Sequence, residues 1–229
     1  MTKISSTLVA LAVALLALQT VAQNPASRQV ELKKGDRIIF FGDSLTALAV
    51  KDPYVPEGKG YVPLVRAALK DRGVEVEAVA TGGHKVTDLL KRVDQDVLAK
   101  KPTIVVIQIG VNDASAGVTP ELFKAQLEEL IGKLQKGGAQ VIQCTCTCRI
   151  EGYDPGNAMD KKLDALAEVA RLIARDKQLP LVNLRKAFID YWKTHNPGNK
   201  PKGLLTYDGN HWNETGHKFV AEQMLKKFK

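Results

Sequence analysis

The sequence comprises 229 residues, of which 45% are hydrophobic and 25% are charged, and its formal net charge is +8. This length and composition suit one globular domain with a full-sized core, and they exclude a chain too small or too polar to fold alone. Lysine and arginine are scattered rather than gathered into a basic stripe with interleaved aromatic residues. We therefore expect no nucleic-acid partner, while weak attraction to an acidic polysaccharide or an anionic surface stays open.

The N-terminal stretch has the pattern of an export signal. Lys3 provides a short positive region, Leu8 to Leu18 form an apolar run, and small residues end at Ala22. An apolar run of about 11 residues falls in the range of signal peptides and is too short to span a bilayer. We predict a cleaved signal peptide over residues 1–22 and one domain over 23–229, with a retained N-terminal anchor as the alternative. The mature protein is then secreted or periplasmic, without stable membrane insertion.

Five apolar runs predict the strands of a sheet. Most of them are uniformly apolar or rich in β-branched residues, as expected for parallel strands that are covered on both faces. In chain order the predicted strands are residues 36–42, 74–80, 103–110, 139–148 and 179–184.

Amphipathic helices are predicted between and after these strands. The helix with the clearest start and stop signals has Thr119 as N-cap, Pro120 in the first turn and Gly137 past its end. The other predicted helices are residues 60–73, 86–101, 159–178 and 213–228. Because strands and helices alternate and no linker divides the chain, the sequence predicts a single α/β domain with a mostly parallel five-stranded sheet.

The three cysteines lie together in QCTCTCR, at positions 144, 146 and 148. If this stretch is a strand, neighbouring thiols share one face at roughly 6.5 Å between Cα atoms, with parallel Cβ vectors. That geometry disfavours a disulfide. We favour buried free thiols, with a disulfide or a metal site as the less favoured alternatives.

Polar residues follow each of the first three predicted strands. Ser44 comes after the first strand, Gly82 and Gly83 after the second, and Asn112 after the third. Since ligands bind outside the carboxyl ends of the strands in open parallel sheets, we expect these groups to gather at one edge. A serine hydroxyl with backbone and side-chain amide donors nearby is suited to acyl transfer.

The C-terminal stretch TYDGNHWNETGH holds Asp208 and His211 three residues apart. A polar turn that leads into a last helix would account for it. Alternatively, the turn folds the Asp208 carboxylate back onto the imidazole, fixes its tautomer and makes His211 the base that activates Ser44. The N–H groups of Ser44 and Gly83 and the side-chain amide of Asn112 would then be the donors to the oxyanion.

Taken together, the motifs resemble the GDSL, or SGNH, hydrolases. That family carries a GDS block near the N-terminus, a glycine after the second strand, GxND after the third and DxxH near the C-terminus. The similarity spans about residues 36 to 228. It implies a flavodoxin-like three-layer α/β/α sandwich and hydrolysis of esters or thioesters without a metal or cofactor. The matching residues here are Gly42-Asp43-Ser44-Leu45, Gly83, Gly110-Val111-Asn112-Asp113, Asp208 and His211.

The sequence departs from the family pattern at two places that bear on substrate. The second block, AVATGGHKVTD, lacks the Asn that the family often has at its head, and His84 stands where Asp or Asn is common. Aligning this block from TDLL favours Gly83 over Gly82 as the oxyanion donor. Trp212 follows His211 where Pro or a small aliphatic residue is frequent. We expect His84 and Trp212 to be candidate substrate contacts.

These observations predict a secreted serine hydrolase of carboxylic esters, with Ser44, His211 and Asp208 as catalytic residues. Few aromatic residues and no long lid segment favour short acyl groups, such as acetyl on a carbohydrate. The alternatives are a lysophospholipase or thioesterase acting on longer chains, and a catalytically silent glycan-binding domain. The expected partner is a small-molecule or polysaccharide ester, and the sequence predicts no particular oligomeric state.

Overall fold

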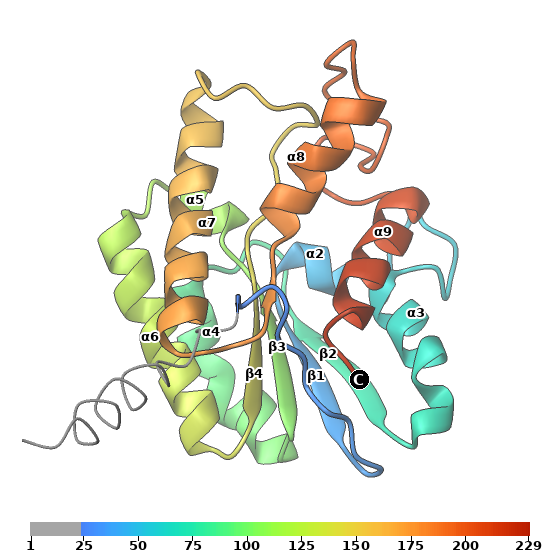
Figure 1. Ribbon diagram of the computed structural model, residues 1–229, viewed down its shortest axis with the longest axis vertical. Coiled ribbons are helices and arrows are strands. Elements are labelled where there is room, and N and C mark those ends of the chain that lie inside the picture. Colours follow the sequence, from blue (N-terminus) through green and yellow to red (C-terminus); the bar gives the residue numbers. More distant parts are fainter. Residues whose placement is uncertain (1–23) are drawn as a thin grey trace, which may run out of the picture.

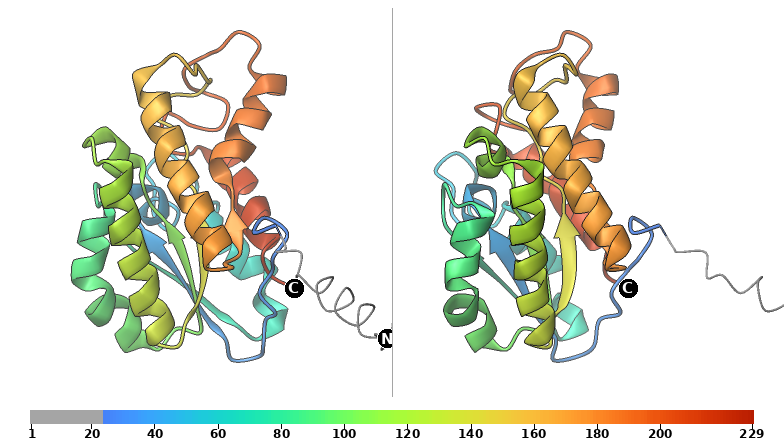
Figure 2. Two further views of the ribbon diagram at one scale, coloured as in Figure 1. Left: turned by 60° about the vertical axis from the view of Figure 1, so that its left-hand side comes forward. Right: turned by 90° about the vertical axis from the view of Figure 1, so that its left-hand side faces the viewer.

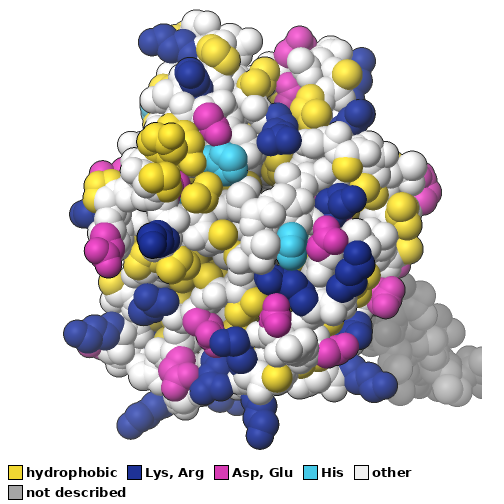
Figure 3. Space-filling view, turned by 180° about the vertical axis from the view of Figure 1, so that it is seen from behind, with side chains coloured by type: hydrophobic (Ala, Val, Ile, Leu, Met, Phe, Trp, Pro, Cys, Tyr) yellow, Lys and Arg dark blue, Asp and Glu magenta, His cyan; other side chains and the backbone are white. Residues whose placement is uncertain are grey.

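A computed structural model describes residues 24–229, so the predicted signal peptide and the start of the domain at residue 23 lie outside the described part. Three layers are visible, with a sheet between two sets of helices (Figure 1). No helix within 24–229 is long and apolar enough to cross a lipid bilayer. Lys and Arg side chains are interspersed with Asp and Glu on the face shown in Figure 3, as expected for a solvated surface.

All five strands of the sheet are parallel, in the order β2-β1-β3-β4-β5. The central strands β1 and β3 are apolar along nearly their whole length, and almost every residue in them is buried, because helices cover both faces. The predicted flavodoxin-like three-layer α/β/α fold is confirmed. The strands are β1 (Arg37–Gly42), β2 (Glu75–Ala80), β3 (Ile104–Gln108), β4 (Gln140–Cys144) and β5 (Leu181–Val182).

Helices α3 and α9 pack together on one face of the sheet, whereas α4, α6 and α7 cover the other (Figures 1 and 2). Two short helices, α2 and α5, follow β1 and β3 directly. The helices are α2 (Ser44–Ala47), α3 (Tyr61–Ala68), α4 (Val86–Arg92), α5 (Val111–Ser115), α6 (Pro120–Lys136), α7 (Ala158–Asp176), α8 (Leu184–His195) and α9 (Glu214–Leu225). Short turns of 3₁₀ or π type are η1 (Lys70–Arg72), η2 (Val93–Val97) and η3 (Leu98–Lys100).

Two predicted strands are shorter in the structure, and the predicted helix 86–101 is α-helical only as far as Arg92. The predicted strand 139–148 ends its pairing at Cys144, because β3 stops at Gln108 and β5 has only two residues, so no neighbour reaches further. Residues 145–148 stay buried without joining a ladder. The predicted strand 179–184 is likewise cut short, because Asn183 caps α8, a helix that the sequence analysis missed.

A buried arginine joins α8 to α7. The guanidinium of Arg185 is 1% exposed, and it pairs with Asp160 at 2.6 Å and with Asp164 at 2.7 Å. It also donates to the carbonyl oxygen of Thr147 at 2.8 Å, while the Arg185 N–H donates to the hydroxyl of Thr145. The arginine therefore holds the stretch that follows β4 against two helices.

We expect Arg185→Met to lower the free energy of unfolding by about 3 kcal/mol, because the carboxylate of Asp160, 3% exposed, loses its charged partner inside the protein. Urea unfolding followed by circular dichroism measures this change. The matched control is Arg175→Met, since Arg175 pairs with Asp176 where both side chains are more than half exposed. Such a pair contributes little to stability. Equal losses in the two variants would contradict the assignment.

Candidate active site

The predicted site residues meet where the order of the strands reverses. The chain passes from β1 to its neighbour β2 on one side and then crosses to β3 on the other. The loops that follow β1 and β3 therefore lie at the position where ligands usually bind in open α/β sheets. Ser44 follows β1 and Asn112 follows β3, so both residues belong to this edge of the sheet.

Ser44 is the first residue of α2, directly beyond the tip of β1. A Cβ at Gly42 would lie 2.4 Å from the carbonyl oxygen of Gln108, so only glycine fits where the two strands end. The side chain of Asp43 caps α2 by accepting from the N–H of Leu45 at 3.0 Å. Asp43 rather than Ser44 thus serves as the cap, which leaves the Ser44 hydroxyl available.

The turn between Thr206 and Trp212 explains the spacing of the acid and the imidazole. The N–H of Tyr207 donates to the carbonyl oxygen of His211 at 3.0 Å and closes the turn. Gly209 at its tip has φ +100°, and a Cβ there would approach two backbone oxygens at 3.1 Å. The turn therefore requires glycine at this position and brings the side chains on either side of it together.

Ser44, His211 and Asp208 form a continuous hydrogen-bonded chain. The Oγ of Ser44 lies 3.0 Å from Nε2 of His211, and Nδ1 of His211 lies 2.7 Å from Oδ2 of Asp208. With the imidazole proton on Nδ1, Nε2 is free to accept from the serine hydroxyl. The structure thus brings together all three residues that the sequence analysis singled out for catalysis.

The other oxygen of the Asp208 carboxylate is also fixed. Its Oδ1 accepts from the N–H groups of Asn210 and His211 at 2.9 and 2.7 Å. Partial burial opposes ionisation, but the hydrogen bonds from the His211 side chain and from these two N–H groups outweigh it and lower the pKa of Asp208. The carboxylate is therefore charged at neutral pH and cannot rotate away from the imidazole without losing two hydrogen bonds.

The three predicted oxyanion donors lie directly after β1, β2 and β3. Within the described residues, neither the N–H of Ser44 nor that of Gly83 donates a hydrogen bond. Gly83 has φ +78° and open space where a Cβ would lie, while a Cβ at Gly82 would sit 3.8 Å from that of Ser44. The side-chain amide of Asn112 donates to the carbonyl oxygen of His84 at 3.0 Å, which ties the third loop to the second.

Two buried carboxyl groups lie beneath these loops. Burial raises the pKa of Asp43 to about 7, and the nearby charge of Asp113 adds to the rise. Burial likewise raises the pKa of Asp113 to about 6, although its Oδ1 accepts from the N–H of Val86. An acid whose pKa is higher in the folded state favours folding when protonated, so the contribution of Asp43 is lost as the pH rises from about 4 to about 7.

The two candidate substrate contacts fall in different places. Trp212 is 1% exposed and packs edge to face on Tyr61, with the ring centroids 5.6 Å apart. The expectation that Trp212 lines the site is therefore wrong, because its indole belongs to the core. His84 is half-buried in the second loop, and its role in binding substrate stays a prediction.

All three cysteines are free and buried. Burial raises the pKa of each thiol, that of Cys146 to about 12. Cys148 lies against the turn between Thr206 and Trp212, here called the triad turn, with its Sγ 3.4 Å from the carbonyl oxygen of Gly209. Among residues 24–229, no three His, Cys, Asp or Glu side chains are grouped so that they could hold a metal ion.

Glu151 is a positioning residue that the sequence analysis missed. Its side chain is 1% exposed and accepts from three consecutive backbone N–H groups, those of Leu204, at 2.7 Å, Leu205 and Thr206. These residues lead directly into the turn that carries Asp208. One carboxylate thus satisfies three buried backbone donors in a row.

We expect Glu151→Ala to lower the free energy of unfolding by about 3 kcal/mol, because it leaves three N–H groups without an acceptor beneath the triad turn. Urea unfolding measures the loss. The control is Glu129→Ala, which removes an exposed carboxylate from α6. If Glu151→Ala were as stable as this control, the hydrogen bonds from the Glu151 carboxylate to residues 204–206 would have no structural importance.

Comparison with known proteins agrees with this geometry. The model of the GDSL-like Lipase/Acylhydrolase family matches residues 40–219. The chain belongs to this family. The GDSL-like hydrolase described here is therefore a carboxylic ester hydrolase, as the sequence motifs predicted, and the match includes the candidate catalytic residues Ser44, Asp208 and His211.

Several relatives of this GDSL-like hydrolase are known esterases. An acetylxylan esterase from Geobacillus stearothermophilus is 27% identical, over 86% of this chain and 96% of its own length. The crystal structure of the acetyl xylan esterase AlAXEase superposes with a TM-score of 0.76 at 35% identity, covering 82% of this chain and 97% of that one. An arylesterase from Vibrio mimicus is 24% identical, over 83% of this chain and 89% of its own. Solved catalytic mutants of the Geobacillus enzyme replace a serine, an aspartate and a histidine.

Proposed function

We propose that this hydrolase removes acetyl groups from carbohydrate esters through an acyl-enzyme formed on Ser44. The observation that carries the proposal is the hydrogen-bonded chain from the Ser44 hydroxyl through His211 to Asp208. A serine hydroxyl is a weak nucleophile at neutral pH, and this arrangement supplies the base that it needs.

In the first half of the reaction, the Oγ of Ser44 attacks the ester carbonyl carbon while Nε2 of His211 takes the hydroxyl proton. The resulting oxyanion accepts from the N–H groups of Ser44 and Gly83 and from the Asn112 amide. The carbon–oxygen bond to the alcohol then breaks, and His211 gives its proton to the departing alcohol oxygen. Asp208 stabilises the imidazolium between these two transfers.

In the second half, water replaces the alcohol. His211 takes a proton from water, the hydroxide oxygen bonds to the acyl carbon, and the bond to Ser44 breaks as its Oγ recovers the proton. The products are the free acid and the regenerated serine. No step requires a metal or a cofactor.

The choice of acetylated carbohydrate as substrate is supported by the two acetylxylan esterases among the relatives, which align along most of their own length. Export is part of the proposal and is supported by the positive residue Lys3 and the apolar run that follows it. A cleaved leader over residues 1–22 would leave a hydrolase domain of 23–229 where polymeric carbohydrate is accessible.

A panel of acetyl, butyryl and palmitoyl p-nitrophenyl esters, together with acetylated xylan, tests this function. We expect the acetyl ester to give the highest kcat/KM and acetylated xylan to release acetate. A higher kcat/KM for the palmitoyl ester would instead favour a lysophospholipase or thioesterase. Failure of the folded protein both to cleave esters and to react with a fluorophosphonate probe would favour a silent glycan-binding domain.

A further inference from the structure

We infer that Tyr54 and Tyr207 form a stacking platform for a sugar ring on the alcohol side of the ester. The inference rests on the proposed function and adds to it a binding site for the carbohydrate. The platform consists of these two aromatic rings, which come from loops far apart in the sequence and extend in line from the triad histidine to the surface.

Three rings follow one another from the catalytic turn outward. The ring of Tyr207 stacks on that of His211, with centroids 5.9 Å apart and 22° between the planes. Tyr54 lies against Tyr207 at 4.7 Å and 43°. Tyr54 is 72% exposed, so one face of its ring is open to solvent.

The loop that carries Tyr54 joins α2 to α3 and meets the Thr206–Trp212 turn through the contact between Tyr54 and Tyr207. The N–H of Tyr54 donates to Oδ1 of Asp52 at 2.7 Å. Asp52 lies near the phenol of Tyr207, whose pKa is raised by burial and by the nearby carboxylates of Asp52 and Asp208. Asp52 therefore lies beside both tyrosines, where the two loops meet.

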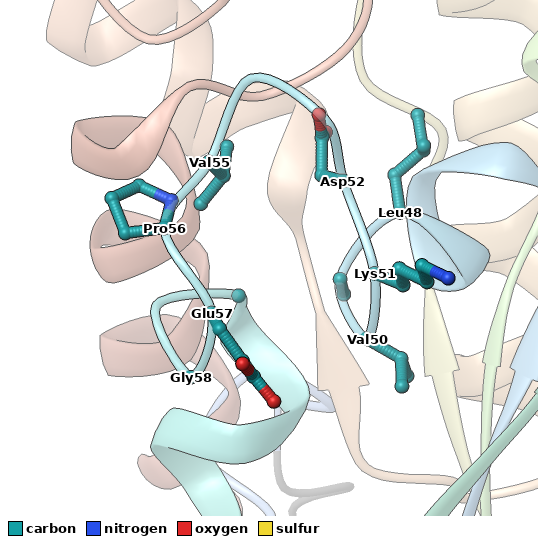
Figure 4. A pocket seen from close by; sticks show the side chains of 10 residues that line it. Leu48, Val50, Lys51, Asp52, Val55, Pro56, Glu57 and Gly58 are labelled. Carbon is teal, nitrogen blue, oxygen red and sulfur yellow. The ribbon is translucent and has the colours of Figure 1, made fainter.

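The loop arches over a cavity of about 540 Å³, which neither Tyr54 nor Tyr207 lines. Figure 4 shows Asp52 at the top of the arch, with Leu48 and Lys51 on one limb and Val55 and Pro56 on the other. Ser44 and His211 are not among the residues that line this cavity. We therefore place the sugar on the open face of Tyr54, outside the arch.

The chemistry of the triad decides which part of the substrate lies there. His211 must deliver its proton to the oxygen of the departing alcohol, so the alcohol lies on the histidine side of Ser44. The carbonyl oxygen of the ester lies toward the oxyanion donors. A ring system adjoining His211 therefore contacts the alcohol.

A pyranose ring fits this surface better than a lipid does. One face of the sugar presents C–H groups that pack on an aromatic ring, while its hydroxyl groups project from the rim. Tyrosine offers an apolar face with a polar tip, and the carboxylate of Asp52 beside the platform can accept a hydrogen bond from a sugar hydroxyl. A long acyl chain presents no hydroxyl groups that could donate to this carboxylate.

The test compares two substrates in the full-length protein by pH-stat: an acetylated xylo-oligosaccharide, and ethyl acetate, whose alcohol has no ring to stack. We expect Tyr54→Ala to lower the ratio of kcat/KM for the oligosaccharide to that for ethyl acetate by about fivefold to tenfold, mainly through KM. Tyr54→Phe keeps the ring and should restore the ratio. Tyr191→Ala is the matched control, because Tyr191 stacks on His195 at 4.0 Å in α8, apart from the triad.

The outcomes separate the platform from the proposed function. If wild type cleaves both substrates and Tyr54→Ala keeps their ratio, the platform is wrong and the proposed function stands. If wild type cleaves ethyl acetate but not the oligosaccharide, the carbohydrate substrate is wrong and the platform falls with it. Sedimentation that changes from dimer to monomer in Tyr54→Ala, with the ratio unchanged, would make this surface a contact between copies and would also overturn the inference.

Discussion

Ser44→Ala is expected to lower kcat for an acetyl ester by on the order of 10⁵ to 10⁶, because the variant has no atom that can bond to the acyl carbon. The side chain is half-buried at the start of α2 and its Oγ contacts Nε2 of His211, so the replacement removes one hydrogen bond and leaves the packing intact. Initial rates with p-nitrophenyl acetate measure the effect. Labelling by a fluorophosphonate probe should disappear in parallel.

Ser27→Ala provides the matched control for this change. Ser27 lies in the N-terminal segment, where its hydroxyl donates to the carbonyl oxygen of Asn24 on the exposed surface. This variant should keep the full rate and the full labelling. Equal rates for Ser44→Ala and wild type would show that the nucleophile is another group.

Asp208→Asn is expected to lower kcat by about 10⁴, because it reverses the tautomer of the histidine. Two backbone N–H groups, those of Asn210 and His211, hold an oxygen at the Oδ1 position. The amide of the variant must therefore turn its NH₂ group toward Nδ1 of His211. Nδ1 then becomes an acceptor, the proton moves to Nε2, and the ring can no longer take the proton of Ser44.

The same rate assay checks this second prediction, with Asp190→Asn as its control. Asp190 is a half-exposed carboxylate on α8 that pairs with Lys186, so its loss should leave kcat unchanged. A loss of less than tenfold in Asp208→Asn would mean that the carboxylate does not orient the imidazole.

The strands were predictable because each one is a short apolar run, but where they stop was not. A strand pairs only as far as the neighbouring strands extend, and the sequence of one apolar run does not contain that information. Cysteines 146 and 148 are buried like strand residues, yet no strand pairs with them. Helix α8 was missed although Leu184, Phe188 and Trp192 recur at helical spacing and are all buried. The short apolar run before the helix was assigned to a strand, and that assignment was extended to residue 184, the first residue of α8.

The catalytic groups were predictable because the motifs place them at fixed offsets from strands or from each other. The groups that support them were not. Nothing in the sequence around Glu151 marks it as the acceptor for three N–H groups some fifty residues later. Tyr54 and Tyr207 are far apart in the sequence, and their rings come into contact only because two loops meet in the folded protein. Trp212 was misplaced because its neighbour His211 faces the site, and adjacent residues in an extended segment point in opposite directions.

The burial of the three thiols has a consequence for how an exported form of this protein would mature. In the folded state, hardly any thiolate is present to attack an oxidant or a disulfide. An unfolded chain in an oxidising compartment has no such protection, and Cys144, Cys146 and Cys148 are close enough in sequence to cross-link. We therefore expect the yield of active enzyme after translocation to depend on a kinetic competition between thiol oxidation and collapse of the core, which ends once residues 144–148 are enclosed.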